Sequence, residues 1–194
     1  SASPDSGDLT VTIKEFESGL FSTFANQTLK KGDIIRVATP KGRFTYDPTR
    51  DQSKTIVAFA AGSGITPIMS IVRAVLEESK DQKCVLIYGN KSPEKTIFYQ
   101  ALLELQSAYE DRLELQFVFS NSHETGAEYG RIDKAYTRSA INTVLDSQKP
   151  AIYYLCGPEG MIHNVKDVLI SHNVPESSIL FELFTASESV KTET

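Results

Sequence analysis

The sequence predicts an α/β fold in which a five-stranded parallel sheet with helices on both faces follows a section of antiparallel β structure. Two observations lead to this prediction. From residue 55 onward, short apolar runs alternate with amphipathic segments, which is the pattern of parallel strands joined by crossover helices. Before residue 47, single apolar residues instead alternate with polar ones, which is typical of strands with one buried face.

The first section is predicted to combine short strands with one helix. Apolar residues alternate with threonine and lysine over residues 9–13, the period of a half-buried strand. Residues 19–29 are typical of a short helix, and Ser22 is a plausible cap for it. A turn at Gly32–Asp33, a further strand and a turn over residues 40–42 follow. This pattern predicts antiparallel β structure over residues 8–46.

The second section begins after a polar, turn-rich stretch over residues 47–54. The run at residues 55–61 is apolar throughout, as expected of a strand buried on both faces. Apolar residues then recur at helical spacing from Ile68 to Leu76, so they share one helix face. The other expected strands cover residues 84–90, 113–120, 151–156 and 178–184, and the other expected helices cover residues 96–109, 133–145 and 158–172.

Composition argues against several classes of function. The 194-residue chain has a net charge of −5 and no basic stripe interleaved with aromatic residues, which argues against nucleic-acid binding. No apolar run approaches the ~20 residues that cross a bilayer, and no secretory signal is seen, so a cytoplasmic location is expected without membrane contact. Cys84 and Cys156 are too few for a zinc or iron–sulfur site, and no metal site is predicted.

The first candidate site is the turn after the first parallel strand, FAAGSGITPIMS over residues 59–70. Open α/β sheets bind phosphates beyond the carboxyl ends of their strands. Gly62 and Gly64, on either side of Ser63, allow positive φ and close approach of a ligand. Thr66 is a natural N-cap and Pro67 a natural first helical residue. By itself the motif fits a phosphate cradle and a capped helix after a tight turn about equally well.

Departures from the usual dinucleotide fingerprint narrow the function of this turn. Pro67 stands where the third glycine of that fingerprint is expected. The second strand ends in Tyr88-Gly89-Asn90-Lys91, without the acidic residue that binds a ribose. A standard NAD dehydrogenase is therefore disfavoured. The turn is also not the G-x-S-x-G motif of a serine hydrolase.

Two further motifs lie at the ends of the fourth and fifth expected strands. Cys156 ends one strand, Gly157 turns the chain and Pro158 opens a helix, which places a thiol at the same edge of the sheet as the glycine turn. Glu182 and Phe184 alternate along the last strand and so share a face. The simpler interpretations are a small apolar residue at a strand end and an edge carboxylate that reaches solvent.

These motifs, in this order and spacing, resemble the ferredoxin–NADP reductase superfamily of flavoproteins. Within it, the chain is most similar to the group that includes the reductase component of phenylacetyl-CoA epoxidase and related oxygenase reductases. The resemblance covers nearly the whole chain. Its motifs are GLFSTFANQTLKKGDIIRVATPKGRF, FAAGSGITPIMSI and YLCGPEGMI.

The resemblance implies a domain division and a role for each candidate residue. Residues 1–50 would be the C-terminal half of an FAD-binding β-barrel domain, residues 51–186 an NAD(P)H-binding domain, and residues 187–194 a tail or linker. The pyridine nucleotide would lie against Gly62, Ser63, Gly64, Thr66, Pro67, Ser120, Gly157 and Pro158. The nicotinamide and hydride path would involve Cys156 and Glu182, and Phe184 would cover the flavin ring. The FAD pyrophosphate would be held by Gly19, Phe21, Ser22 and Thr23.

The same resemblance implies FAD and NAD(P)H as cofactors and an iron–sulfur protein, a flavodoxin or an oxygenase component as electron acceptor. Relatives in this group continue into a [2Fe–2S] domain, and the sequence leaves open whether one follows here. The Arg-x-Tyr-Ser motif that grips flavin normally lies upstream of a stretch like residues 1–9. We therefore expect weak FAD binding by this chain, with a nucleotide-binding module without catalysis as the alternative function. Exposed strand edges of a half barrel would favour pairing with another copy.

Cofactor preference depends on the residues after the third strand of the sheet. Relatives that prefer NADP carry Ser-Arg there, whereas this chain has Ser120 followed by Asn121. The missing guanidinium gives a slight preference for NADH. Lys91, Lys95 and Arg131 are cations that would compensate, so the choice between the two nucleotides stays open.

Overall fold

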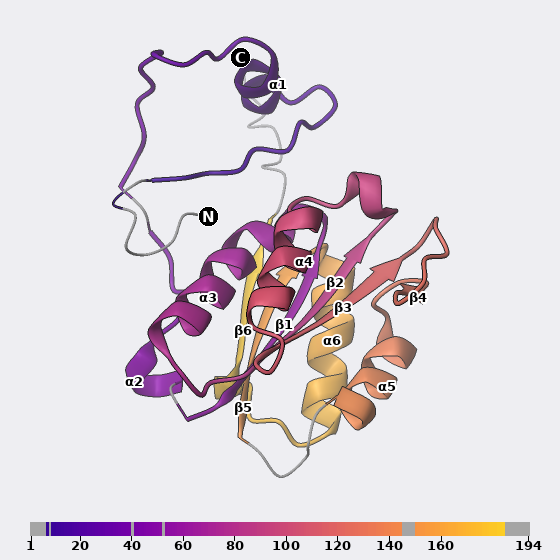
Figure 1. Ribbon diagram of the computed structural model, residues 1–194. Coiled ribbons are helices and arrows are strands. Elements are labelled where there is room, and N and C mark those ends of the chain that lie inside the picture. The colour runs from indigo at the N-terminus through magenta and orange to yellow at the C-terminus, as the bar shows by residue number, and fades with distance from the viewer. Residues whose placement is uncertain (1–6, 8, 40, 52, 145–149, 185–194) are drawn as a thin grey trace, which may run out of the picture.

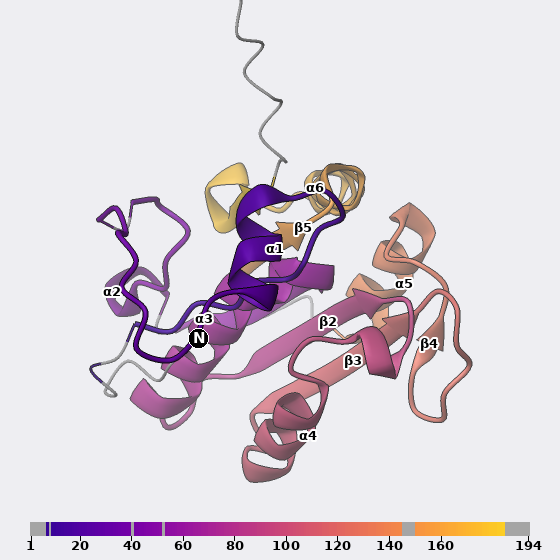
Figure 2. The same ribbon diagram turned by 90° about the horizontal axis from the view of Figure 1, so that it is seen from above.

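The fold is an open, twisted parallel sheet with helices on both faces, preceded by an N-terminal segment (the described residues before α2) that adds no strand to the sheet (Figures 1 and 2). The computed structural model describes residues 7, 9–39, 41–51, 53–144 and 150–184. The strands are β1 (Thr55–Ala61), β2 (Cys84–Asn90), β3 (Leu113–Phe119), β4 (Glu128–Tyr129), β5 (Ala151–Gly157) and β6 (Ile179–Leu183). The α-helices are α1 (Leu20–Gln27), α2 (Pro48–Asp51), α3 (Ile65–Glu78), α4 (Tyr99–Ala108), α5 (Lys134–Val144) and α6 (Glu159–Ser171).

Helices cover the two faces of the sheet in pairs. Figure 2 shows α3 and α4 on one face and α5 and α6 on the other. Residues of even number in β1, from Ile56 to Ala60, point into the core under α3 and α4, and Val57 and Phe59 point into the core under α5 and α6. Burial on both faces explains why these strands are almost uniformly apolar.

The strand order β4-β3-β2-β1-β5-β6 places a topological switch point between β1 and β5. The chain leaves β1 through α3 toward β2 on one side, whereas β5 pairs with β1 from the other side. Open α/β sheets bind ligands beyond the carboxyl ends of the strands at such a point. The turns after β1 and β5, which the sequence marks as candidate sites, both lie there.

The predicted parallel α/β sheet is confirmed, with one strand more than expected. The addition is β4, two residues that pair with Val118 and Phe119 at the end of β3. A strand of two residues has no periodicity, so a sequence pattern cannot reveal it. In the expected helix at residues 96–109, the α-helix begins only at Tyr99, after a short 3₁₀ turn over Pro93–Lys95 and a left-handed Phe98.

The predicted antiparallel strands of residues 8–46 are not formed, and this part of the prediction is wrong for the described residues. The helix expected at residues 19–29 is present as α1, and a turn ends with the Asp33 amide bonded to the Lys30 carbonyl at 3.1 Å. Among the described residues, the two expected strands do not join the sheet, and Leu9 is 85% and Ile34 96% exposed. A strand is stable only when its backbone groups are paired.

In Figure 1, this N-terminal segment forms a loop beyond the edge of the sheet at which the strands end, with α1 near its tip. The division of the chain into domains at residues 50 and 186 stays a prediction, and the predicted tail at residues 187–194 lies outside the described residues. No helix within the described part of the chain is long and apolar enough to span a membrane.

Candidate nucleotide-binding site

The turn after β1 has the conformation that only glycine adopts readily. Gly62 has φ +54, in the left-handed region, and begins a 3₁₀ turn over Gly62–Gly64 that runs directly into α3. Among the described residues, a Cβ on Gly62 would meet only the Nζ atom of Lys14, 4.0 Å away. The Tyr88 hydroxyl donates a hydrogen bond of 2.9 Å to the Gly62 carbonyl. The Tyr88 hydroxyl therefore holds the turn at the Gly62 carbonyl, whereas the space that a Gly62 side chain would occupy is open.

Gly64 does not have the positive φ that its position in the motif suggested. Its φ is −61, which any residue adopts. Glycine is needed there for space, because a Cβ would lie 2.1 Å from the carbonyl oxygen of Cys156 and 2.7 Å from the Gly157 nitrogen. The start of α3 thus packs directly on the backbone at the end of β5.

The predicted N-cap at Thr66 is also wrong. The helix begins at Ile65, and its N-cap is Gly64, without a side-chain cap. Thr66 is the second helical residue, and its hydroxyl donates to the Ser63 carbonyl at 3.1 Å. In a regular helix this carbonyl would accept the N–H of residue 67, which Pro67 lacks. Thr66 therefore replaces the hydrogen bond that Pro67 cannot make.

The turn after β5 lies against the turn after β1. Gly157 has φ +157, and a Cβ there would lie 3.1 Å from the Ala61 nitrogen and 2.9 Å from the Met161 side chain. Pro158 is the N-cap of α6, and its carbonyl accepts the amides of Met161 and Ile162. Two motifs almost a hundred residues apart in sequence thus form one surface at the switch point.

Cys156 and Glu182 are direct neighbours across β5 and β6, as their Cα atoms are partners in the register of the sheet. Cys156 is fully buried. Burial, and to a lesser degree the Glu182 carboxylate, raises the pKa of its thiol to about 12. The thiol therefore stays protonated at neutral pH and is no nucleophile.

A groove of about 850 Å³ brings several predicted site residues together. Its walls include Thr66 and Pro67 from the start of α3 and Glu182 and Phe184 from the end of β6. The chain before β1 contributes further lining residues, which are Thr10, Val11, Thr12, Phe44, Thr45, Tyr46 and Pro48. Phe184 is 48% exposed, so its ring is available to a ligand.

Ser120 lies at the same edge of the sheet but outside this groove. It follows β3, two strands from β1, and its amide donates to the Asn90 carbonyl at 3.0 Å. The next amide, of Asn121, donates to the Lys91 carbonyl at 2.9 Å. Lys91, one of the compensating cations, is thereby held beside Ser120 and Asn121.

The four residues expected to hold the FAD pyrophosphate lie at the start of α1 and do not line the groove. Gly19, not Ser22, is the N-cap, and the Thr23 amide donates to its carbonyl at 3.0 Å. The Ser22 hydroxyl instead accepts the Phe16 amide at 3.1 Å. Phe21 is 56% exposed.

The sequence pattern does not predict that two further residues, Lys14 and Tyr88, lie near the glycine turn. Lys14 belongs to the alternating stretch near the N-terminus, where a lysine marks a solvent face, and nothing in that pattern points toward Gly62. Tyr88 stands out in sequence only as a replacement for the expected acid. The register that aligns Tyr88 with Ala60, one residue from the end of β1, reveals its role as a support for the turn.

These features fit a dinucleotide. The space above Gly62 suits an anion, since no other described side chain approaches within 4 Å and the Lys14 ammonium lies at its border. Gly160, in the first turn of α6, also faces open space. Among the described residues, no group of three or more histidine, cysteine or acidic side chains gathers as a metal site would require.

Comparisons with known proteins agree with this geometry. Residues 59–167 match the family described as the oxidoreductase NAD-binding domain. One component of the 1,2-phenylacetyl-CoA epoxidase of Escherichia coli K12 is 31% identical over 179 residues, which cover 92% of this chain and 50% of that protein. The ferredoxin reductase component of the 3-ketosteroid-9-alpha-monooxygenase of Mycolicibacterium smegmatis is 32% identical, covering 97% and 50%.

A solved structure shares the fold. The CS-b5R domains of human Ncb5or, in the NAD+ form, superpose with a TM-score of 0.76 and 26% identity, covering 89% of this chain and 48% of that one. The chain spans about half the length of the curated relatives it matches. The predicted resemblance to ferredoxin reductases is confirmed, and the chain belongs to the oxidoreductase NAD-binding domain family.

Proposed function

We propose that this chain is the nucleotide-binding part of an NAD(P)H-dependent flavoprotein reductase, which takes hydride from NAD(P)H and passes electrons through FAD to an acceptor protein. The observation that carries the proposal is the contact between the Gly62–Gly64 turn and the Gly157 turn at the switch point. This contact leaves an open, glycine-lined surface at the place where parallel sheets bind nucleotides.

The residues around the glycine turn would hold the pyrophosphate. Gly62 lets the phosphate approach the backbone, and Lys14 supplies a cation at the border of the space. The Tyr88 hydroxyl keeps the Gly62 carbonyl turned away from the anion. Thr66 and Pro67 shape the start of α3, and the positive end of the helix dipole favours a negative charge there.

The nicotinamide would lie toward Cys156, Glu182 and Phe184. When bound, NAD(P)H supplies a hydride and FAD accepts it. The protein aligns the two rings and excludes water between them. Phe184 offers a half-exposed aromatic surface, and Cys156 contributes a small neutral side chain under the site. Glu182 brings a carboxylate to this side of the groove and would orient polar groups of the nucleotide.

The acceptor would be an iron–sulfur protein, a flavodoxin or an oxygenase component. Two relatives are named as parts of such systems, one in an epoxidase and one as a ferredoxin reductase component. Between the nucleotides, we propose NADH, because Asn121 lacks the guanidinium that would bind a 2′-phosphate. Lys91 beside it is the residue that would raise NADPH affinity. A strong preference for NADPH in parallel titrations would overturn the choice of NADH.

Titration with NADH, followed by nucleotide fluorescence, tests the binding site. Gly62→Ala is expected to weaken NADH binding by at least about tenfold. The added methyl group occupies the space for the phosphate, and the left-handed conformation of the turn becomes about 1–2 kcal/mol less favourable. Gly32→Ala is the control, because Gly32 also has positive φ and open surroundings but lies in the N-terminal turn. Equal affinity of both variants for NADH would exclude this site.

The second candidate is a nucleotide-binding module without catalysis. It is favoured by the absence of any buried residue in α1, which carries the residues expected to hold FAD. Flavin content and NADH-dependent reduction of an artificial acceptor separate the two functions. Bound FAD with turnover supports the reductase, and NADH binding without flavin or turnover supports the module.

A further inference from the structure

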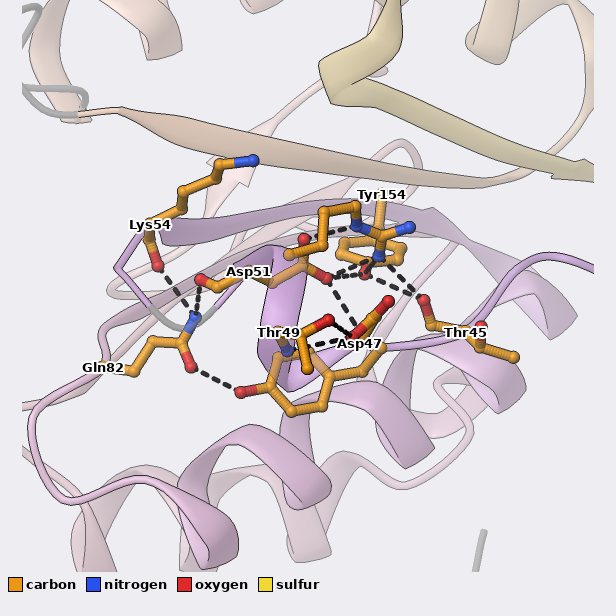
Figure 3. Close-up of polar contacts among 9 residues, drawn as sticks. Thr45, Asp47, Thr49, Asp51, Lys54, Gln82 and Tyr154 are labelled. Atoms are coloured by element: carbon orange, nitrogen blue, oxygen red, sulfur yellow. Dashed lines mark hydrogen bonds and ion pairs between the residues drawn. The ribbon is translucent and has the colours of Figure 1, made fainter.

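A buried polar network joins the segment before β1 to the centre of the sheet. Asp51 is completely buried, yet it carries a carboxylate. Arg50 binds both of its oxygens at 2.5 Å, and the Tyr154 hydroxyl donates to Oδ2 at 2.8 Å. Figure 3 shows Asp51, Tyr154 and Thr45 converging, and the Thr45 carbonyl lies 3.1 Å from the Tyr154 hydroxyl. A buried charge is tolerated only with partners of this kind.

Gln82, in the loop between α3 and β2, extends this network. Its amide donates to the carbonyls of Asp51 at 2.7 Å and Lys54 at 2.9 Å, and its oxygen accepts the Tyr46 hydroxyl at 2.8 Å. Gln82 itself is 5% exposed. Both sides of α2 are thus tied to the nucleotide-binding domain, in a stretch that the sequence marks only as a polar boundary.

The same segment forms one wall of the groove. Phe44, Thr45 and Tyr46 line it together with Glu182 and Phe184. The Phe44 ring meets the Tyr154 ring edge-on, with centroids 5.4 Å apart. Tyr154 and Cys156 lie two residues apart in β5 and so on the same face of the sheet. One strand therefore both anchors the N-terminal wall and carries the cysteine beside the proposed hydride site.

We infer that Tyr154, Asp51, Arg50 and Gln82 are positioning residues, which hold the N-terminal segment at a fixed place relative to the Cys156–Glu182 edge. The inference rests on the proposed function, because hydride transfer depends on the alignment of two rings held by different parts of the chain. Reacting atoms must approach to about 3–3.5 Å, and a misplacement of about 1 Å costs up to about a hundredfold in rate. Rigidity at this joint is therefore a requirement of the reaction.

Tyr154→Phe tests the inference, with Tyr153→Phe as the matched control. Both changes delete one hydroxyl from β5, but Tyr153 faces the opposite core, under α5 and α6. Hydrogen exchange is measured first and needs no flavin. In Tyr154→Phe, the hydrogen-bonded amides of Asp47, Thr49, Arg50 and Asp51 should exchange roughly tenfold faster, whereas those of β1 and β5 should keep their rates. NADH affinity should change less than about twofold, because the nucleotide turns are untouched.

Single-turnover hydride transfer in the FAD-loaded protein is measured second. Tyr154→Phe should lower this rate about tenfold at unchanged NADH affinity, and Tyr153→Phe should match the wild type. If Tyr154→Phe fails to fold, Tyr46→Phe tests the same joint, since it removes only the bond to Gln82. Equal exchange and equal rates in variant and control would overturn the inference. If the wild-type protein does not bind NADH, the proposed function is overturned, and the hydrogen-exchange result still tests the joint.

Discussion

The nucleotide-binding part and the N-terminal segment both contain apolar patterns that predict strands, with opposite outcomes. Ile56 in β1 is fully buried between two paired strands, whereas Ile34 is 96% exposed in an extended stretch that pairs with no described strand. Both isoleucines lie in apolar segments that predict strands. The difference shows that an apolar pattern indicates a segment that is able to pair as a strand. Whether its side chains are buried depends on which other segments are close enough to pair with it.

The largest expected difference between the two regions is the reactivity of cysteine, buried in the sheet or exposed in the N-terminal segment. Burial raises the pKa of Cys84 and of Cys156 from 9.0 to about 12, so the thiolate fraction at pH 8 falls about a thousandfold. We expect alkylation of both at pH 8 to be slower by about that factor than alkylation of Val37→Cys, at a position 72% exposed. Mass spectrometry of the labelled peptides measures the rates. Comparable rates at all three sites would contradict the contrast.

The same burial predicts a dependence of stability on pH. The unfolded thiols release protons above about pH 9, whereas the folded ones keep theirs until about pH 12. The free energy of unfolding should therefore fall as the pH rises through this window. Urea unfolding at pH 8 and pH 10 measures it, and the double variant Cys84→Ala, Cys156→Ala should lose this part of the pH dependence.

Truncation of one isoleucine in each region tests the contrast in packing. Ile56→Ala should lower the free energy of unfolding by about 2–5 kcal/mol, because it leaves a cavity in the core. Ile34→Ala should stay within about 0.5 kcal/mol, because the side chain is exposed. Urea unfolding measures both. A large loss for Ile34→Ala would show that the N-terminal segment packs more tightly than its exposure indicates.

Two glycines sharpen the comparison between a close backbone contact and open space. Gly64→Ala should cost about 1–3 kcal/mol, since its Cβ would collide with the Cys156 carbonyl, a backbone atom that cannot turn away. Gly160→Ala is the control, as its Cβ would meet nothing within 4 Å and alanine favours a helix. Thermal unfolding under identical conditions compares them. Equal stability would contradict the close packing of α3 on β5.

The smallest expected effect concerns the support of the glycine turn. Tyr88→Phe removes the hydrogen bond to the Gly62 carbonyl and should cost about 0.5–1.5 kcal/mol of stability. NADH affinity should fall a few fold, because the turn then samples other conformations. Tyr136→Phe on α5, a partly buried tyrosine of the opposite face, is the control. Unchanged NADH affinity in Tyr88→Phe would show that the turn keeps its shape without the hydroxyl.

Much of the fold could be predicted because its signals are local. The alternation of apolar runs and amphipathic segments after residue 55 corresponds to β1 through β6, apart from the two-residue β4. The glycine turn and the Cys156-Gly157-Pro158 turn could be located for the same reason, since a strand followed by glycine leaves a local mark. Their roles toward FAD and NAD(P)H stay predictions until ligands are tested.

The rest depends on contacts between distant residues. Gly64 is glycine because the backbone of Cys156 passes beside it, and Thr66 bonds to Ser63 because Pro67 has no amide hydrogen. Lys14 reaches the turn at Gly62 from a segment that its pattern assigns to solvent. None of these contacts produces a periodic pattern in the sequence from which it could be predicted.

The sequence by itself determined the parallel α/β architecture and the place of the two turns, because periodicity and turn chemistry act over a few residues. Only the tertiary structure decided that these turns touch, that the described N-terminal residues join no strand of the sheet, and that Asp51 and Tyr154 join the two regions. Each of these outcomes depends on the free energy of a contact between segments tens of residues apart. Such a contact leaves no local pattern in the sequence.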